Sequence, residues 1–190
     1  MKHFYLILLS LTVSFSAFSQ KNIPIKNSSF KSDLQDWDTV VWGEEYDEPK
    51  ALFDITKKGR NDSKALKVSV RKNSSKKNGD QIFIKQNGFK LKKGKEYRIS
   101  FWVKSRAYND QIMFRIFSAP DTGSSKPWGA VVDKTFEFDG KGEWIKLTHT
   151  FIAEPIYENK NIDYKKLAVL VGFDKRMGTY LVDDFILERL

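Results

Sequence analysis

Apolar and polar residues alternate with a period of two in several windows of this chain, and no window shows a sustained helical period. Such alternation is typical of β-strands that bury one face and expose the other. The windows are residues 65–70, 81–85, 97–104, 112–117 and 167–173. Glycine-containing turns separate them, as at 93–95 and 139–142. We predict an all-β fold, an antiparallel β-sandwich, with one short helix near 162–165.

The alternation also assigns side chains to faces. In window 97–104, Trp102 falls on the polar side, away from the apolar positions. Arg115 and Phe117 have the same outward parity in window 112–117. If these two strands pair, the three side chains form an exposed platform that combines aromatic and basic groups. The alternative is that a loop or the N-terminal segment covers this face.

The N-terminus carries the features of a secretory signal. Leu6 to Phe18 is an apolar run, and Ala17 and Ser19 are small residues at the positions that a signal peptidase reads. We expect a signal peptide over 1–19 and a single domain over 20–190, with no membrane span after cleavage. A retained membrane anchor is the alternative. The expected location is outside the cell, in the periplasm or at the cell surface.

Composition narrows the chemistry of an exported protein. The 190 residues include no cysteine, which excludes disulfides, thiolate catalysis and a lipid-anchored N-terminal cysteine. The formal charge is +9, and removal of Lys2 with the signal lowers it to +8. This excess is compatible with an anionic polysaccharide, with an anionic surface or simply with solubility. Nucleic acid is not expected, because export removes that partner and no basic helix appears.

The residues offer little for catalysis. His149 is the single histidine of the expected mature chain, on a strand between threonines, and we interpret it as a packed or surface residue. No nucleophile elbow of the Gly-x-Ser-x-Gly type occurs. The acidic run at 44–48 precedes a proline and indicates a loop, although a glycosidase needs only two carboxylates. We expect no catalytic residues and no enzyme activity.

Five segments in order carry a family resemblance: Asn27-Ser28-Ser29-Phe30 with Trp37, then 59–70, 91–104, 144–151 and 180–187. Together they resemble the carbohydrate-binding modules of families 4, 9 and 22. The resemblance implies a galactose-binding-domain-like jelly roll of two antiparallel sheets. It also implies a ligand on a concave face or loop rim, with Trp37 and Trp144 in core positions. A polysaccharide or oligosaccharide is the expected partner of a monomeric protein.

Protein surfaces bind sugars by stacking aromatic rings on the apolar faces of pyranoses and by hydrogen-bonding the hydroxyl groups. The side chains that we expect to contact a sugar lie in loops or on outward strand positions. They are Trp42, Tyr46, Trp102, Tyr108, Arg115, Phe117 and Trp128.

The same family resemblance implies a structural calcium ion. Asp183 matches the family aspartate near the last strand, and backbone carbonyls near Asn27 would assist it. In the family a carboxylate often follows the opening phenylalanine, but here that residue is Lys31. Because calcium prefers carboxylate ligands, this replacement weakens the expected site.

These observations predict a secreted, non-catalytic protein that binds cell-wall polysaccharide. Two alternatives remain open at this point. One is a small polysaccharide-degrading enzyme, a glycoside hydrolase or lyase, on the same sandwich. The other is a cell-surface structural or protein-interaction module that has lost its sugar site.

Overall fold

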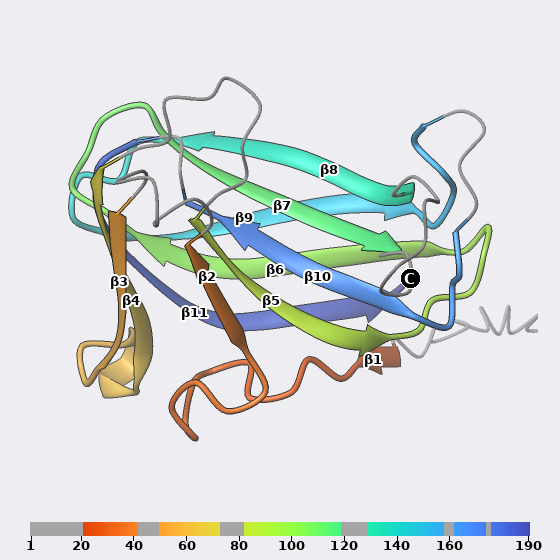
Figure 1. Cartoon of the computed structure of the whole chain (residues 1–190), viewed down its shortest axis with the longest axis horizontal. Helices are drawn as coiled ribbons and strands as arrows, with labels where there is room; N and C mark the ends of the chain where they lie inside the picture. The colour runs from red at the N-terminus through yellow and green to blue at the C-terminus, as the bar shows by residue number, and fades with distance from the viewer. Residues whose placement is uncertain (1–20, 42–49, 73–81, 119–128, 158–161, 174–175) are drawn as a thin grey trace, which may run out of the picture.

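Two antiparallel β-sheets make up the fold, and they pack face to face (Figure 1). The computed structural model describes residues 21–41, 50–72, 82–118, 129–157, 162–173 and 176–190. Within these residues, no helix has the length and hydropathy that a bilayer crossing requires.

The first sheet, called sheet A here, has the strand order β3-β4-β11-β6-β9, and β1 pairs with the far end of β11. Its strands are β1 (Lys21–Ile23), β3 (Lys50–Thr56), β4 (Ala65–Lys72), β6 (Glu96–Lys104), β9 (Trp144–Ile152) and β11 (Gly178–Arg189). A single 3-10 turn, η2 (Arg60–Asp62), lies in the connection between β3 and β4.

The second sheet, sheet B, has the order β2-β5-β10-β7-β8. Its strands are β2 (Asp38–Val41), β5 (Ile82–Phe89), β7 (Asp110–Ser118), β8 (Gly129–Phe138) and β10 (Leu167–Gly172). Only β3-β4 in sheet A and β7-β8 in sheet B are consecutive neighbours among the described strands; the other pairs are distant in sequence, so each sheet is assembled mainly from crossovers between the two layers.

The core lies between the sheets and is built from the apolar positions of the alternating windows. Phe101 of β6 stacks on Phe185 of β11 with ring centroids 5.0 Å apart, and on Phe114 of β7 across the sandwich at 6.0 Å. These rings are at most 2% exposed. Burial of such aromatic surface is the main stabilising contribution in a domain without disulfides.

The segment before β2 closes one side of this core. Phe30 and Trp37 pack against Phe185, with ring centroids 6.2 and 5.3 Å apart. Asn27 holds the turns between them, because its side-chain amide donates hydrogen bonds to the carbonyls of Asp33 and Gln35, each at 2.9 Å. The predicted core position of Trp37 is confirmed.

The all-β sandwich and the alternating windows are confirmed, but three local predictions are wrong. Residues 162–165 form a turn rather than a helix, closed by a hydrogen bond from Lys166 N to Asp163 O. Trp144 lies half-buried on the outer side of β9, on the same side as Lys146, and is not in the core. Strands β6 and β7 do not pair, because each belongs to a different sheet.

Candidate functional site

The outer face of sheet B carries a polar cluster that bridges β7, β8 and the segment after β9. Arg115 and Asp133 are cross-strand partners, and an Arg115 guanidinium nitrogen donates to Asp133 Oδ2 at 2.8 Å. The Tyr157 hydroxyl donates to the same oxygen at 2.5 Å. The side chains of Arg115 and Asp133 are 23% and 20% exposed, so both reach solvent. A charge-assisted bond holds the carboxylate in one orientation at the surface.

A second polar pair lies further along the same two strands. Gln111 of β7 is opposite Glu137 of β8, and its amide donates to Glu137 Oε1 at 3.1 Å. Thr135, between Asp133 and Glu137 on the same face, is exposed. Amide, hydroxyl and carboxylate groups therefore follow one line across this face, spaced by the strand repeat.

Beside this polar line lies a small apolar cluster on the outer face of sheet B. It contains Met113, Phe117, Ala130, Ala168 and Leu170, with Phe83 partly buried against it. Phe117 is only 1% exposed, so its ring is not available as the open stacking surface that we expected. Phe83 of β5 is instead the half-exposed ring. In window 81–85, Phe83 alternates with the inward residues, and this outward position was the sequence signal for an accessible ring. We did not include Phe83 among the candidate sugar contacts.

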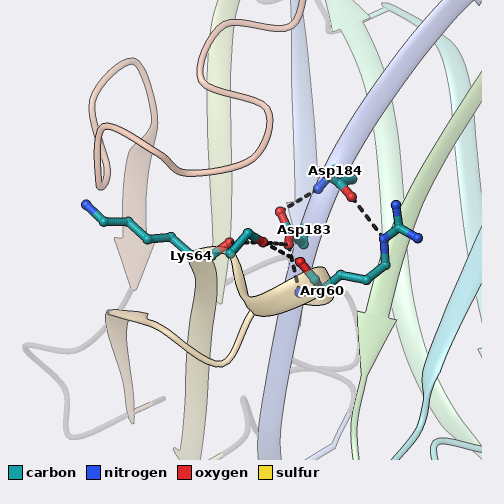
Figure 2. Close-up of polar contacts among 5 residues, drawn as sticks. Arg60, Lys64, Asp183 and Asp184 are labelled. Carbon is teal, nitrogen blue, oxygen red and sulfur yellow. Dashed lines mark hydrogen bonds and ion pairs between the residues drawn. The ribbon is translucent and has the colours of Figure 1, made fainter.

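Trp102 faces outward as predicted, but on sheet A. The Arg60 guanidinium lies over the indole, with its carbon 4.3 Å from the ring centroid. Arg60 also donates from Nε to Asp184 Oδ2 at 3.0 Å, an ion pair that Figure 2 shows beside β11. The expected platform with Arg115 and Phe117 does not form, because those residues lie on the opposite outer face. The covered arrangement of Trp102, our stated alternative, is the one observed.

Asp183 lies directly beneath the η2 turn and has no exposed surface. Its Oδ2 accepts hydrogen bonds from Arg60 N at 3.1 Å and from Ser63 Oγ at 3.0 Å, and its Oδ1 accepts from Asp184 N at 2.8 Å (Figure 2). Burial, followed by the neighbouring charge of Asp184, raises the pKa of Asp183 despite these donors. The carboxylate serves to hold the 60–64 turn against β11.

The residues around Asp183 do not fit a calcium site. Both of its oxygens are occupied by protein donors, and calcium needs several oxygen ligands. The Lys64 ammonium donates to the Lys31 carbonyl at 3.0 Å and to Asp33 Oδ1 at 2.6 Å, so an internal cation holds this part of the N-terminal segment. No group of three metal-ligating side chains occurs among the residues that the structure describes. The backbone near Asn27 is used in turns, with Phe30 N donating to Asn27 O.

The other predicted sugar contacts are placed as follows. Tyr108 is 67% exposed in the connection between β6 and β7. Trp42, Tyr46 and Trp128 lie outside the described residues, as does the acidic run at 44–48. Of the described candidates, only Arg115 and Phe117 are brought together, on neighbouring rungs of β7.

His149 takes the packed position that we expected. Its ring lies 6.4 Å from Phe136 and 6.2 Å from Phe151, measured between centroids. Burial, and secondarily the charge of Lys134, lowers its pKa and favours the neutral ring. Packing against these two aromatic rings accounts for the position of the histidine.

A six-stranded and a five-stranded antiparallel layer with this crossover order, and a polar-aromatic outer face, define a jelly-roll sandwich of the carbohydrate-binding-module class. The model of the carbohydrate binding domain family of types 4 and 9 matches residues 24–169. The chain belongs to that family.

Three solved structures illustrate the range of this fold. A family 4 carbohydrate-binding module is 19% identical, with a TM-score of 0.63 over 88% of this chain and 100% of that one. A family 22 xylan-binding domain from Paenibacillus barcinonensis is 14% identical, with a TM-score of 0.52 over 85% and 91%. A Stig cyclase from Fischerella sp. TAU is 12% identical, with a TM-score of 0.60 over 90% and 98%. No curated protein sequence matches this chain.

Proposed function

We propose that this protein is an exported, non-catalytic module that binds polysaccharide on the outer face of sheet B. The observation that carries the proposal is the Arg115–Asp133–Tyr157 cluster, which shares the outer face of sheet B with the half-exposed Phe83. Membership of a carbohydrate-binding family supports the ligand class. The signal-like residues 1–19 support export.

The cluster has the chemistry that a sugar requires. Arg115 and Tyr157 both donate to Asp133 Oδ2, and among the described residues no donor reaches Asp133 Oδ1. That oxygen is an acceptor for a sugar hydroxyl, while the amide of Gln111 offers a donor. Since two partners already orient the carboxylate, little conformational entropy is lost when a ligand binds.

The apolar part of the face completes this recognition. Phe83 presents a ring to the apolar side of a pyranose, which contributes on the order of 1 kcal/mol. Water competes for each hydroxyl, so each hydrogen bond adds only about 1 kcal/mol. We therefore expect weak affinity per site and binding to chains rather than to single sugars.

Affinity electrophoresis of residues 20–190 in gels containing xylan, β-glucan, galactan or polygalacturonate tests the proposal. Asp133→Asn and Phe83→Ala should each weaken retardation about tenfold in the glycan that binds. Asp62→Asn removes one exposed carboxylate of the 3-10 turn on the sheet A side and should change nothing. Absence of retardation in every gel would overturn the proposal and favour a protein-interaction module.

A second candidate function is the polysaccharide-degrading enzyme left open by the sequence, and the fold match to a Stig cyclase shows only that an enzyme can have this sandwich. An enzyme on this sandwich remains compatible with the described residues, and the polysaccharide-degrading alternative is the one to measure. Release of reducing ends and of unsaturated products should be assayed on the same glycans. Turnover that disappears on substituting a carboxylate would replace the binding-only proposal.

A further inference from the structure

A recess of about 760 Å³ opens on the outer face of sheet A, at the end where β6 finishes and β11 begins. Its walls include Lys58, Lys67, Lys104, Arg106, Thr179 and Leu181. The volume falls in the range of small-ligand sites. It is separate from the polar cluster of sheet B, which lies on the opposite face of the sandwich.

The recess concentrates more positive than negative charge: four cationic side chains line it, and the nearest exposed carboxylate in the strand register is Asp54 of β3, opposite Lys67. Lys58, Lys67, Lys104 and Arg106 form no ion pair with any described carboxylate. The acid in the lining, Asp110, is 1% exposed and accepts the Tyr180 hydroxyl at 2.7 Å.

Other basic residues on the sandwich contrast with these four. Lys64, Lys85 and Arg98 each lie within 4 Å of a carboxylate, so ion pairs do form elsewhere on the surface of the sandwich. Four like charges around one recess repel each other, and an anionic occupant would relieve that repulsion.

The sheet places these side chains in one cross-strand row. Lys67 of β4 is opposite Leu181 of β11, Leu181 is opposite Lys104 of β6, and Lys104 is opposite Trp144 of β9. Residues in one row point to the same face, and the two ammonium-bearing strands are about 10 Å apart. Two cations therefore alternate with an aliphatic side chain and a half-buried indole, and the row ends at Asp54 of β3, opposite Lys67.

We infer that this recess binds the carboxylate or sulfate groups of an acidic polysaccharide. The inference rests on the proposed function and narrows its ligand class. A concave recess lined by Leu181, with Trp144 next to Lys104 in the same cross-strand row, suits individual sugar rings, whereas a flat cationic surface would suit a membrane. Tyr108, 67% exposed directly after the recess-lining residues 105–107, adds an aromatic side chain on that side.

Isothermal titration of residues 20–190 with polygalacturonate, dextran sulfate, neutral xylan and single-stranded DNA tests the inference. The double substitution Lys67→Gln with Lys104→Gln should lower affinity for an acidic glycan at least about tenfold and reduce its salt dependence. Affinity for a neutral glycan should not change. The polygalacturonate and dextran sulfate arms separate carboxylate from sulfate recognition.

The control double substitution, Lys95→Gln with Lys165→Gln, removes two exposed charges at the other end of the sandwich. Equal loss in both double variants would mean general charge attraction and would overturn the inference. DNA that binds as tightly as the acidic glycan, and loses as much affinity in the recess double variant, would show that the recess binds any polyanion. That result would also overturn the inference. Binding of neutral glycan alone would reject the recess and keep the proposed function, and no glycan binding at all would reject both.

Discussion

Two aspartates on opposite faces of the sandwich, Asp183 and Asp133, show how similar side chains take different roles. Asp183 has no exposed surface and accepts three protein hydrogen bonds shared over both oxygens. Asp133 is 20% exposed and accepts its two described hydrogen bonds on one oxygen. The family resemblance draws attention to Asp183, yet the geometry makes Asp133 the carboxylate that can meet a ligand.

The difference teaches that acceptor capacity, rather than residue type, separates a structural carboxylate from a binding one. A buried carboxylate must be satisfied within the fold, because an unpaired one costs several kcal/mol. Once its oxygens accept hydrogen bonds from the protein, such a carboxylate is not available to a ligand. A half-exposed carboxylate held from one side keeps lone pairs for another molecule.

The largest expected effect is on stability, at Asp183. Asp183→Ala leaves the Arg60 amide, the Asp184 amide and the Ser63 hydroxyl without their acceptor, and we expect a loss of about 3 kcal/mol in the free energy of unfolding. Asp184→Asn removes a half-exposed ion pair but keeps a residue type that tolerates the positive φ of 52° at this position, and it should cost less than about 1 kcal/mol. Urea unfolding followed by tryptophan fluorescence measures both. Similar losses for the two variants would contradict the contrast.

The next largest expected effect is on glycan affinity, at Arg115. Arg115→Ala removes the donor that orients Asp133, and we expect about a tenfold loss of glycan affinity with little change in unfolding. Arg60→Ala is the paired control on sheet A, where the guanidinium covers Trp102. It should leave glycan affinity unchanged. Binding lost only in the Arg60 variant would move the site to the other face.

A smaller effect is expected where Lys64 joins the 60–64 turn to the N-terminal segment. Lys64→Met keeps the aliphatic stem but removes the donor to the Lys31 carbonyl and Asp33. The pair is partly exposed, so the expected loss is about 1 kcal/mol or less. Lys21→Met on β1 serves as the exposed control, and urea unfolding compares the two. No difference between them would show that this contact adds nothing.

The pH dependence from His149 should be shallow. Its pKa in the fold lies below the ordinary value of 6.5, so the unfolded chain takes up the proton first as the pH falls. Stability from the neutral ring is present above pH 6.5 and is lost as the pH falls toward the lowered value. In His149→Gln, the free energy of unfolding should depend less on pH between 7.5 and 5. An unchanged slope would mean that the ring titrates normally.

The smallest expected effect is from calcium. Since protein donors satisfy Asp183 and the Lys64 ammonium supplies a cation nearby, neither calcium nor a chelator should move the melting temperature by more than about 1 °C. Differential scanning fluorimetry with millimolar calcium or EDTA checks this. A clear rise with calcium would restore the family metal site near Asp183.

Sequence reasoning located the core well, because burial imposes a period of two that can be read directly. It placed Trp37 inside and Trp102 outside correctly. It failed for strand partners: β6 joins β9 and β11, whose residues are far away in the chain. It left open whether Trp102 is covered, since the Arg60 contact comes from an irregular turn without a periodic signal.

The amino-acid sequence by itself determined the all-β class, the family resemblance, the inward set of side chains and the excess of lysine. These properties follow from local alternation and composition. The tertiary structure alone decided which outward residues share a face, which carboxylate is saturated, and that Lys67 and Lys104 line one recess. The physical reason is that face and exposure depend on strand order, and strand order is set by long-range pairing that no local pattern encodes.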